Sequence, residues 1–139
     1  MPVRVLVVDD NLYVRRGICT LLSTDPALHV VCDTADGEDA IAKAQDLQPD
    51  LILLDISLGA TSGIEAAGKI RKVSPHSRII FVSQYDSIHV AREAMRVGAH
   101  GYIVKSDAGQ ELLRGIRAVV QGKGYVSQRL VAQGWATPE

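Results

Sequence analysis

Five short apolar segments recur along the chain at intervals of roughly 22 to 27 residues, and this repetition restricts the fold more than any other feature. They are Val3 to Val8, His29 to Cys32, Leu51 to Asp55, Arg78 to Val82 and Gly101 to Val104. Each segment is almost continuously apolar and does not alternate between apolar and polar residues. Because the strands of a parallel sheet are buried on both faces, this pattern predicts five parallel strands.

The stretches between these strands carry apolar residues at helical spacing, as in Val14, Ile18, Leu21 and Leu22. Asp36, Ser62 and Asp107 are expected to cap the helices that follow them, and the last two read as capping boxes with Glu65 and Gln110. Alternating strands and helices predict an α/β fold with right-handed crossovers. Five such units fit a flavodoxin-like (βα)5 doubly wound parallel sheet with strand order 2-1-3-4-5.

The length of 139 residues suits one domain, which we assign to residues 1–124. Residues 125–139 are expected to be a C-terminal tail or a truncated linker, because the residues after Lys123 are too few for an output domain. The net charge of −1 does not suggest a nucleic-acid-binding surface. No apolar run is long enough for a membrane span and no signal region opens the chain, so we expect a cytoplasmic protein.

The predicted strand order directs attention to the carboxyl ends of the first and third strands, where ligands bind in such sheets. Asp9 and Asp10 follow the first strand, and Asp55 ends the third. Three neighbouring carboxylates repel one another unless a cation lies between them, and Mg²⁺ prefers oxygen ligands of this kind. The sequence therefore predicts a Mg²⁺ site, although Asp9 and Asp10 could instead only cap the first helix.

The residues around this site suit phosphoryl transfer. The carboxylate of Asp55 can attack phosphorus and form an acyl phosphate, a reaction that needs mainly alignment and charge neutralisation. Lys105 ends the fifth strand and would supply a second positive charge, while Ser83 ends the fourth and would donate from its hydroxyl. A solvated lysine and an ordinary turn serine are the alternatives. Tyr102 is either a core residue or a side chain that swings between buried and exposed positions.

Asp9–Asp10, Asp55, Ser83 and Lys105, in this order on five βα units, resemble the receiver domain of two-component response regulators. The resemblance covers about residues 3–124. It implies that Asp55 is the phosphoacceptor and that Asp9 and Asp10 are Mg²⁺ ligands together with the backbone carbonyl of Ser57. It also implies that Ser83 and Lys105 bind the phosphoryl group and that Tyr102 is the switch aromatic. Gly63 also matches the family pattern.

This resemblance implies a phosphorylation-dependent signalling switch that receives its phosphoryl group from a sensor histidine kinase or a phosphotransfer protein. Phosphorylation would shift a surface near the fifth strand and the fourth and fifth helices. The chain is similar to receivers with a LuxR-type helix-turn-helix output, which implies a regulator of transcription if a DNA-binding domain was removed. We expect no enzyme activity beyond slow self-dephosphorylation, because Ser57 stands where aspartyl-phosphate hydrolases usually carry a second acid.

Two positions depart from the family pattern. Leu58–Gly59 replaces a common Met-Pro pair, and Ser106 follows Lys105 where the family often has a cis proline. A cis bond before a non-proline residue costs about 2.5–4 kcal/mol, so we expect the Lys105–Ser106 bond to be trans.

Other interpretations stay open for the surface and the function. His89, Arg92 and Arg96 share a helix face that is either solvated or part of a homodimer surface on the fourth and fifth helices. The alternative functions are a phosphorylation-independent interaction domain, a single-domain regulator and a flavin- or nucleotide-binding module. No membrane contact and no direct nucleic-acid contact is expected.

Overall fold

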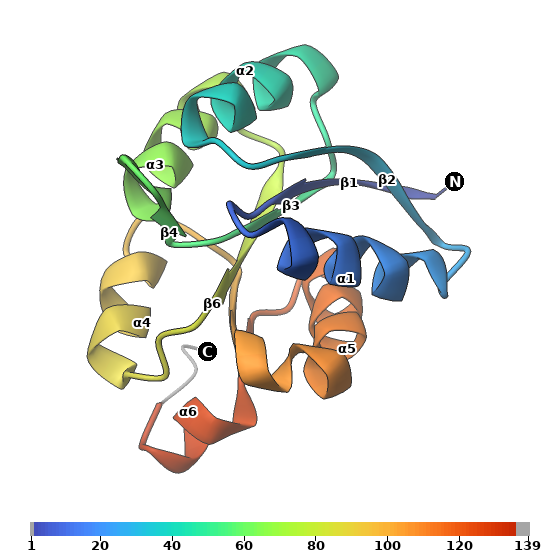
Figure 1. The fold of residues 1–139 in the computed structure, drawn as a ribbon. Helices are drawn as coiled ribbons and strands as arrows, with labels where there is room; N and C mark the ends of the chain where they lie inside the picture. The colour runs from blue at the N-terminus through green and yellow to red at the C-terminus, as the bar shows by residue number, and fades with distance from the viewer. Residues whose placement is uncertain (1, 136–139) are drawn as a thin grey trace.

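The computed structural model describes residues 2–135, in which a six-stranded sheet lies between two layers of helices (Figure 1). The strand order is β2-β1-β3-β6-β7-β8, and every neighbouring pair is parallel. The first five strands are β1 (Val3–Val8), β2 (Leu28–Thr34), β3 (Leu51–Leu54), β6 (Arg78–Ser83) and β7 (Gly101–Val104). They correspond to the five predicted strands, so the predicted order 2-1-3-4-5 is confirmed.

Helices cover both faces of the sheet, as expected for crossovers between parallel strands (Figure 1). On one face lie α1 (Leu12–Ser23) and α5 (Ala108–Val120), and on the other lie α2 (Gly37–Leu47), α3 (Gly63–Val73) and α4 (Ile88–Met95). Successive strand residues point to opposite faces. Val5 and Val7 of β1 therefore pack with α1 and α5, whereas Leu6 and Val8 belong to the core under the other three helices.

The helix starts agree only in part with the predicted caps. Asp36 accepts a hydrogen bond from Glu38 N at 3.2 Å, and Ser62 accepts one from Ile64 N at 3.2 Å, so both act as N-caps. The predicted cap at Asp107 is wrong. A 3-10 turn, η1 (Lys105–Asp107), leads directly into α5, so the backbone of Asp107 is not extended as an N-cap requires and its side chain makes no cap bond.

The chain after α5 adds two elements that the sequence analysis did not predict. Within the segment expected to be a tail or linker, β8 (Tyr125–Val126) pairs with β7, and α6 (Gln128–Ala132) follows. In Figure 1, α6 lies below the sheet between α4 and α5. Residues 136–139 lie outside the described part of the chain. A small hairpin of β4 (Ser57–Leu58) and β5 (Thr61–Ser62) completes the structure, turning at Gly59 with a φ of 69°.

Candidate functional site

The two buried carboxylates of the site are held at the edge of the sheet by the strand hydrogen bonds themselves. Asp9 N donates to Thr34 O at 3.1 Å, and Asp55 N donates to Val8 O at 3.0 Å. These bonds continue the ladders one residue beyond β1 and β3. Asp9 and Asp55 are 1% and 2% exposed, so apolar strands deliver two charged groups into a buried position.

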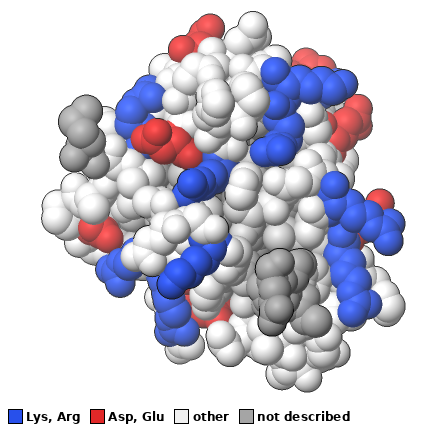
Figure 2. All heavy atoms as spheres, turned by 180° about the vertical axis from the view of Figure 1, so that it is seen from behind, with Lys and Arg blue, Asp and Glu red and all other residues white. Residues whose placement is uncertain are grey.

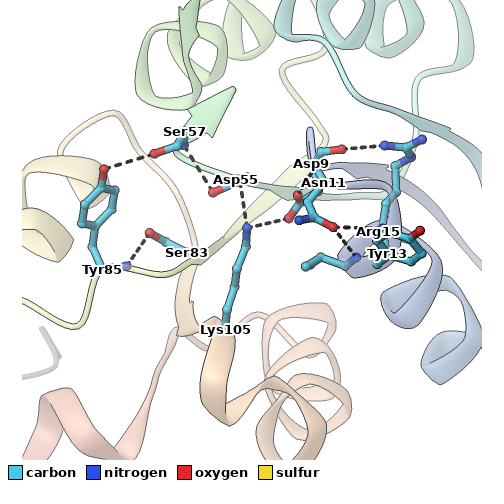
Figure 3. Close-up of polar contacts among 10 residues, drawn as sticks. Asp9, Asn11, Tyr13, Arg15, Asp55, Ser57, Ser83, Tyr85 and Lys105 are labelled. Atoms are coloured by element: carbon cyan, nitrogen blue, oxygen red, sulfur yellow. Dashed lines mark hydrogen bonds and ion pairs between the residues drawn. The ribbon is translucent and has the colours of Figure 1, made fainter. Parts of the chain in front are cut away.

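Lys105 joins these two acids from the end of β7 (Figure 3). Its Nζ donates a hydrogen bond to Asp55 Oδ2 at 2.9 Å and forms an ion pair with Asp9 Oδ2, also at 2.9 Å. The lysine side chain is 21% exposed. The Lys105–Ser106 bond is trans, as expected. One ammonium group thus faces two carboxylates from two different strands.

Asp10 completes a cluster of three acids at this edge. One carboxylate oxygen from each of Asp9, Asp10 and Asp55 lies within 4.8 Å of the others. Asp10 is exposed, whereas the other two are buried. One ammonium group, Lys105 Nζ, lies 2.9 Å from the carboxylates of Asp9 and Asp55 and offsets part of the negative charge of the cluster. A hard cation with oxygen ligands would reduce the repulsion that remains among the three acids, so these residues fit Mg²⁺.

Burial and charge contacts act in opposite directions on the pKa values of Asp55 and Lys105. Burial raises the pKa of Asp55 above its usual 3.8, and the nearby Asp9 raises it further, while the bond from Lys105 opposes both effects. Burial also disfavours the charged form of Lys105, but its contacts with Asp9 and Asp55 raise its pKa above 10.5. The site therefore keeps Lys105 protonated, whereas one ammonium does not fully compensate the burial of the Asp55 carboxylate.

Two residues at the start of α1 hold Asp9 in place. Asn11 caps α1 through bonds from Tyr13 N and Val14 N, and its own N–H donates to Asp9 Oδ1 at 2.9 Å. Arg15 donates to the carbonyl oxygen of Asp9 at 2.8 Å (Figure 3). Arg15 is not among the site residues predicted from the sequence. Its position one turn after Asn11 was the available signal, because a helix directs residue i+4 back toward its cap.

Arg15 also connects β1 to the edge strand β2. Its Nε lies 2.8 Å from Asp33 Oδ1, and the arginine side chain is 14% exposed. The guanidinium is thereby fixed at both ends, which restricts where the Asp9 backbone can move.

The hydroxyl-bearing residues lie on the other side of Asp55. Ser83 is fully buried at the end of β6, and its Oγ accepts a hydrogen bond from Tyr85 N at 3.1 Å. Ser57 N donates to Asp55 Oδ1 at 3.3 Å, and Ser57 Oγ donates to the Tyr85 hydroxyl at 3.2 Å. Tyr85 therefore bridges the loops after β3 and β6 (Figure 3). Tyr85 is not among the site residues predicted from the sequence, since a single tyrosine in a loop carries no pattern.

Tyr102 is fully buried in β7, and its hydroxyl donates to Tyr85 O at 2.8 Å. Burial raises the pKa of this phenol above 10.0. Of the two alternatives left open for this residue, the structure places the side chain in the buried position. The same loop, Ser83 to Tyr85, thus contacts both the phenol of Tyr102 and the hydroxyl of Ser57.

Gly63 is required by a close approach of two backbones behind the site. A Cβ at this position would lie 1.9 Å from the carbonyl oxygen of Asp55, and Gly63 N donates to Ile56 O at 2.6 Å. No side chain fits there without displacing the residue that carries the central carboxylate.

Away from the site, the face opposite to that of Figure 1 carries both basic and acidic side chains. Figure 2 shows basic side chains spread over it with acidic ones among them. At the C-terminal end of α4, Arg96 of the predicted basic face pairs with Glu93 at 3.0 Å. No helix within residues 2–135 has the length and apolar character needed to cross a membrane.

Comparison with known proteins agrees with the predicted family and fold. The family model described as "Response regulator receiver domain" matches residues 5–117. The response regulator GacA of Pseudomonas viridiflava is 33% identical over 131 residues, covering 94% of this chain and 61% of GacA. VraR of Staphylococcus saprophyticus is 36% identical over 117 residues, covering 84% of this chain and 56% of VraR.

Solved structures give the same result. A two-component response regulator of the LuxR family from Aurantimonas sp. SI85-9A1 superposes with a TM-score of 0.90 at 30% identity, covering 95% of this chain and 94% of the other. The response regulator domain of Thermotoga maritima CheB superposes with a TM-score of 0.80 at 32% identity, covering 87% and 98%.

The fold and the acidic edge define a signalling domain of two-component systems. This chain belongs to the response regulator receiver family. It spans about three fifths of the length of the curated relatives that it matches.

Proposed function

We propose that this receiver domain is a switch that accepts a phosphoryl group on Asp55 from a sensor histidine kinase or a phosphotransfer protein. The observation that carries the proposal is the pair of contacts from Lys105 Nζ, 2.9 Å from both Asp9 and Asp55, beside a third acid, Asp10. A buried carboxylate with a fixed cation on one side and an acidic cation site on the other is suited to becoming an acyl phosphate.

Mg²⁺ would be held by Asp9, Asp10, Asp55 and the backbone carbonyl of Ser57, and when bound it would neutralise part of the charge on the transferred group. Asp55 would attack the phosphorus of a phosphohistidine, so that an O–P bond forms as the P–N bond breaks. The electron pair of the P–N bond would return to the imidazole nitrogen. Lys105 would move from its two carboxylates toward a phosphoryl oxygen.

The response to phosphorylation would start at Ser83. The Ser83 hydroxyl accepts a hydrogen bond from Tyr85 N. If this hydroxyl turned to donate to a phosphoryl oxygen, it would pull on the loop in which Tyr85 O accepts a hydrogen bond from the Tyr102 hydroxyl. The charge added at Asp55 would thereby change the conformation of the surface formed by β7, α4 and α5.

The chain would not act as an enzyme in its own right beyond slow self-dephosphorylation. Two residues after Asp55 stands Ser57, whose hydroxyl is engaged by Tyr85 and which carries no carboxylate to activate water. The Tyr85 side chain, 39% exposed, would further restrict the approach of water from that side.

The proposal places the protein in the cytoplasm and gives it a role in regulating transcription when a DNA-binding domain follows. A second copy of the chain could use the α4 and α5 faces, although α6 already lies beside them (Figure 1). We assign no direct nucleic-acid contact to the receiver itself.

The test is incubation with Mg²⁺ and a small acyl phosphate, followed by intact mass measurement. The wild-type chain should gain one phosphoryl group, and Asp55→Asn should gain none. Asp50→Asn, which removes an acid five residues away whose carboxylate accepts from Arg4 N, is the matched control and should behave as the wild type. Equal uptake by Asp55→Asn would overturn the proposal.

A further inference from the structure

The segment from β8 to the end of the described chain packs on the receiver as one continuous strap. We define the strap as Tyr125–Trp135. Ser127 N donates to Tyr102 O at 3.0 Å, and Ser127 Oγ accepts from Val104 N at 2.9 Å. Leu130 is fully buried in the same core cluster as Tyr102. The strap thus covers the edge of β7 that the five-stranded sheet would otherwise leave open.

A buried carboxylate on α5 fixes the start of α6. Glu111 is 5% exposed, and its Oε2 accepts hydrogen bonds from Tyr125 OH and from Gln128 N, both at 3.0 Å. A buried charged acceptor with two donors from the strap indicates a specific docking contact.

The far side of α6 is tied to the two loops that leave the phosphorylation site. Arg129 binds Asp107 with two bonds of 2.9 and 3.0 Å, and its Nη1 lies 3.7 Å from Asp86 Oδ2. Gln133 Nε2 donates to Asp86 O at 2.9 Å. Asp86 lies three residues after Ser83, and Asp107 lies two residues after Lys105. Ser83 and Lys105 are the two residues proposed to bind the phosphoryl group, so each acid that contacts Arg129 follows one of them closely in the chain.

We propose that the strap is latched by Arg129 in the unphosphorylated state and released when Asp55 is phosphorylated. This inference rests on the proposed function. Movement of Ser83 and Lys105 toward a phosphoryl group would shift Asp86 and Asp107 independently. The guanidinium of Arg129 would then be unable to keep its contacts with both acids. The contact with Asp86 is the longer one and is lost first. Release frees the α4–β7–α5 edge, which the strap covers, for another contact.

Trp135 makes the strap observable, because it is the only tryptophan in the chain. It lies half-buried beside Met95, Ala99 and His100. These residues precede β7, whereas Asp55 and Lys105 lie at the opposite, carboxyl edge of the sheet. A change in Trp135 fluorescence on phosphorylation therefore reports movement of the strap and not direct contact with the phosphoryl group.

The experiment is acrylamide quenching of Trp135 in the full chain, before and after treatment with Mg²⁺ and a small acyl phosphate, with intact mass measured on the same samples. In the wild type we expect the quenching constant to rise by about twofold or more on phosphorylation, as for a locally opened segment. Asp55→Asn should show no rise.

Variants of Arg129 test the latch itself. Arg129→Ala should show the raised quenching constant before phosphorylation, and Arg129→Lys should lie between it and the wild type. The matched control is Arg117→Ala, which removes the same charge from an exposed arginine paired with Asp25 at 3.6 Å. It should behave as the wild type.

Each outcome separates the two proposals. If the wild type gains no phosphoryl group, the proposed function fails. If it is phosphorylated and Trp135 quenching stays the same, the strap is not coupled to the site. If Arg129→Ala quenches as the unphosphorylated wild type does, Arg129 is not the latch.

Discussion

Replacing Lys105 with methionine removes the ammonium of the site and keeps an unbranched side chain as far as Cε. Nζ lies 2.9 Å from carboxylates of Asp9 and Asp55, which are both buried. At an effective dielectric constant of about 20, each contact is worth about 6 kcal/mol before the desolvation of the ammonium is subtracted. Breaking a buried pair costs about 3–5 kcal/mol, and because Lys105 is 21% exposed we expect a smaller loss of about 2–3 kcal/mol.

Mg²⁺ should reverse part of this loss. Without the ammonium, the cation meets less repulsion, and we expect its Kd to fall by about tenfold in Lys105→Met. Saturating Mg²⁺ should therefore stabilise the variant by about 1.4 kcal/mol more than it stabilises the wild type. Phosphoryl uptake on Asp55 should nevertheless fall by about tenfold or more, because the second positive charge is gone.

The assay is urea unfolding with and without Mg²⁺ at neutral pH. The control is Lys69→Met, which removes an exposed lysine paired with Glu65 at 3.8 Å and should change the free energy of unfolding by less than about 0.5 kcal/mol. If Lys105→Met is as stable as the wild type without Mg²⁺, the electrostatic reasoning about the site is wrong.

Three further predictions concern the same edge of the sheet. Asp10→Asn should weaken Mg²⁺ binding by about tenfold, measured by titration, with little change in the stability of the metal-free protein, because Asp10 is exposed. Gly63→Ala should lower the free energy of unfolding by about 3 kcal/mol or more, since its Cβ would lie 1.9 Å from Asp55 O. In contrast, Gly109→Ala, whose Cβ would meet no other segment of residues 2–135 within 4 Å, should raise it by about 0.5–1 kcal/mol. The pKa of Asp55 is raised in the folded state, so the folded protein binds this proton more tightly than the unfolded chain does. The stability that results is fully present below pH 3.8 and is lost as the pH rises through the folded pKa. Without Mg²⁺, urea unfolding across this range should therefore show the wild type losing stability relative to Asp55→Asn, and parallel curves would contradict the assignment.

The parts of the molecule that could be predicted from the sequence are those set by short-range pattern and by topology. Continuous apolar runs at regular spacing gave the five strands, and parallel strands bring their carboxyl ends to one edge. Asp9, Asp55 and Lys105 therefore had to meet, although they are up to 96 residues apart in the sequence.

The parts that could not be predicted depend on contacts between distant segments. Asp107 has the sequence signal of a helix cap, but Arg129, 22 residues later, engages its carboxylate. Tyr85 gains its place only because Ser57 and Tyr102 approach the same loop from two other strands. The short β8 is defined by pairing with β7 and has no apolar run of its own.

The measurement that tests the central claim most directly is the location of the transferred phosphoryl group as a function of Mg²⁺. Borohydride reduction of the acyl phosphate, followed by peptide mass mapping, converts the acceptor aspartate to homoserine and so marks its position. We predict homoserine at position 55 alone, in a yield that rises with Mg²⁺ and is lost on chelation. Homoserine at another acid, or a yield at position 55 that does not depend on Mg²⁺, would contradict the account.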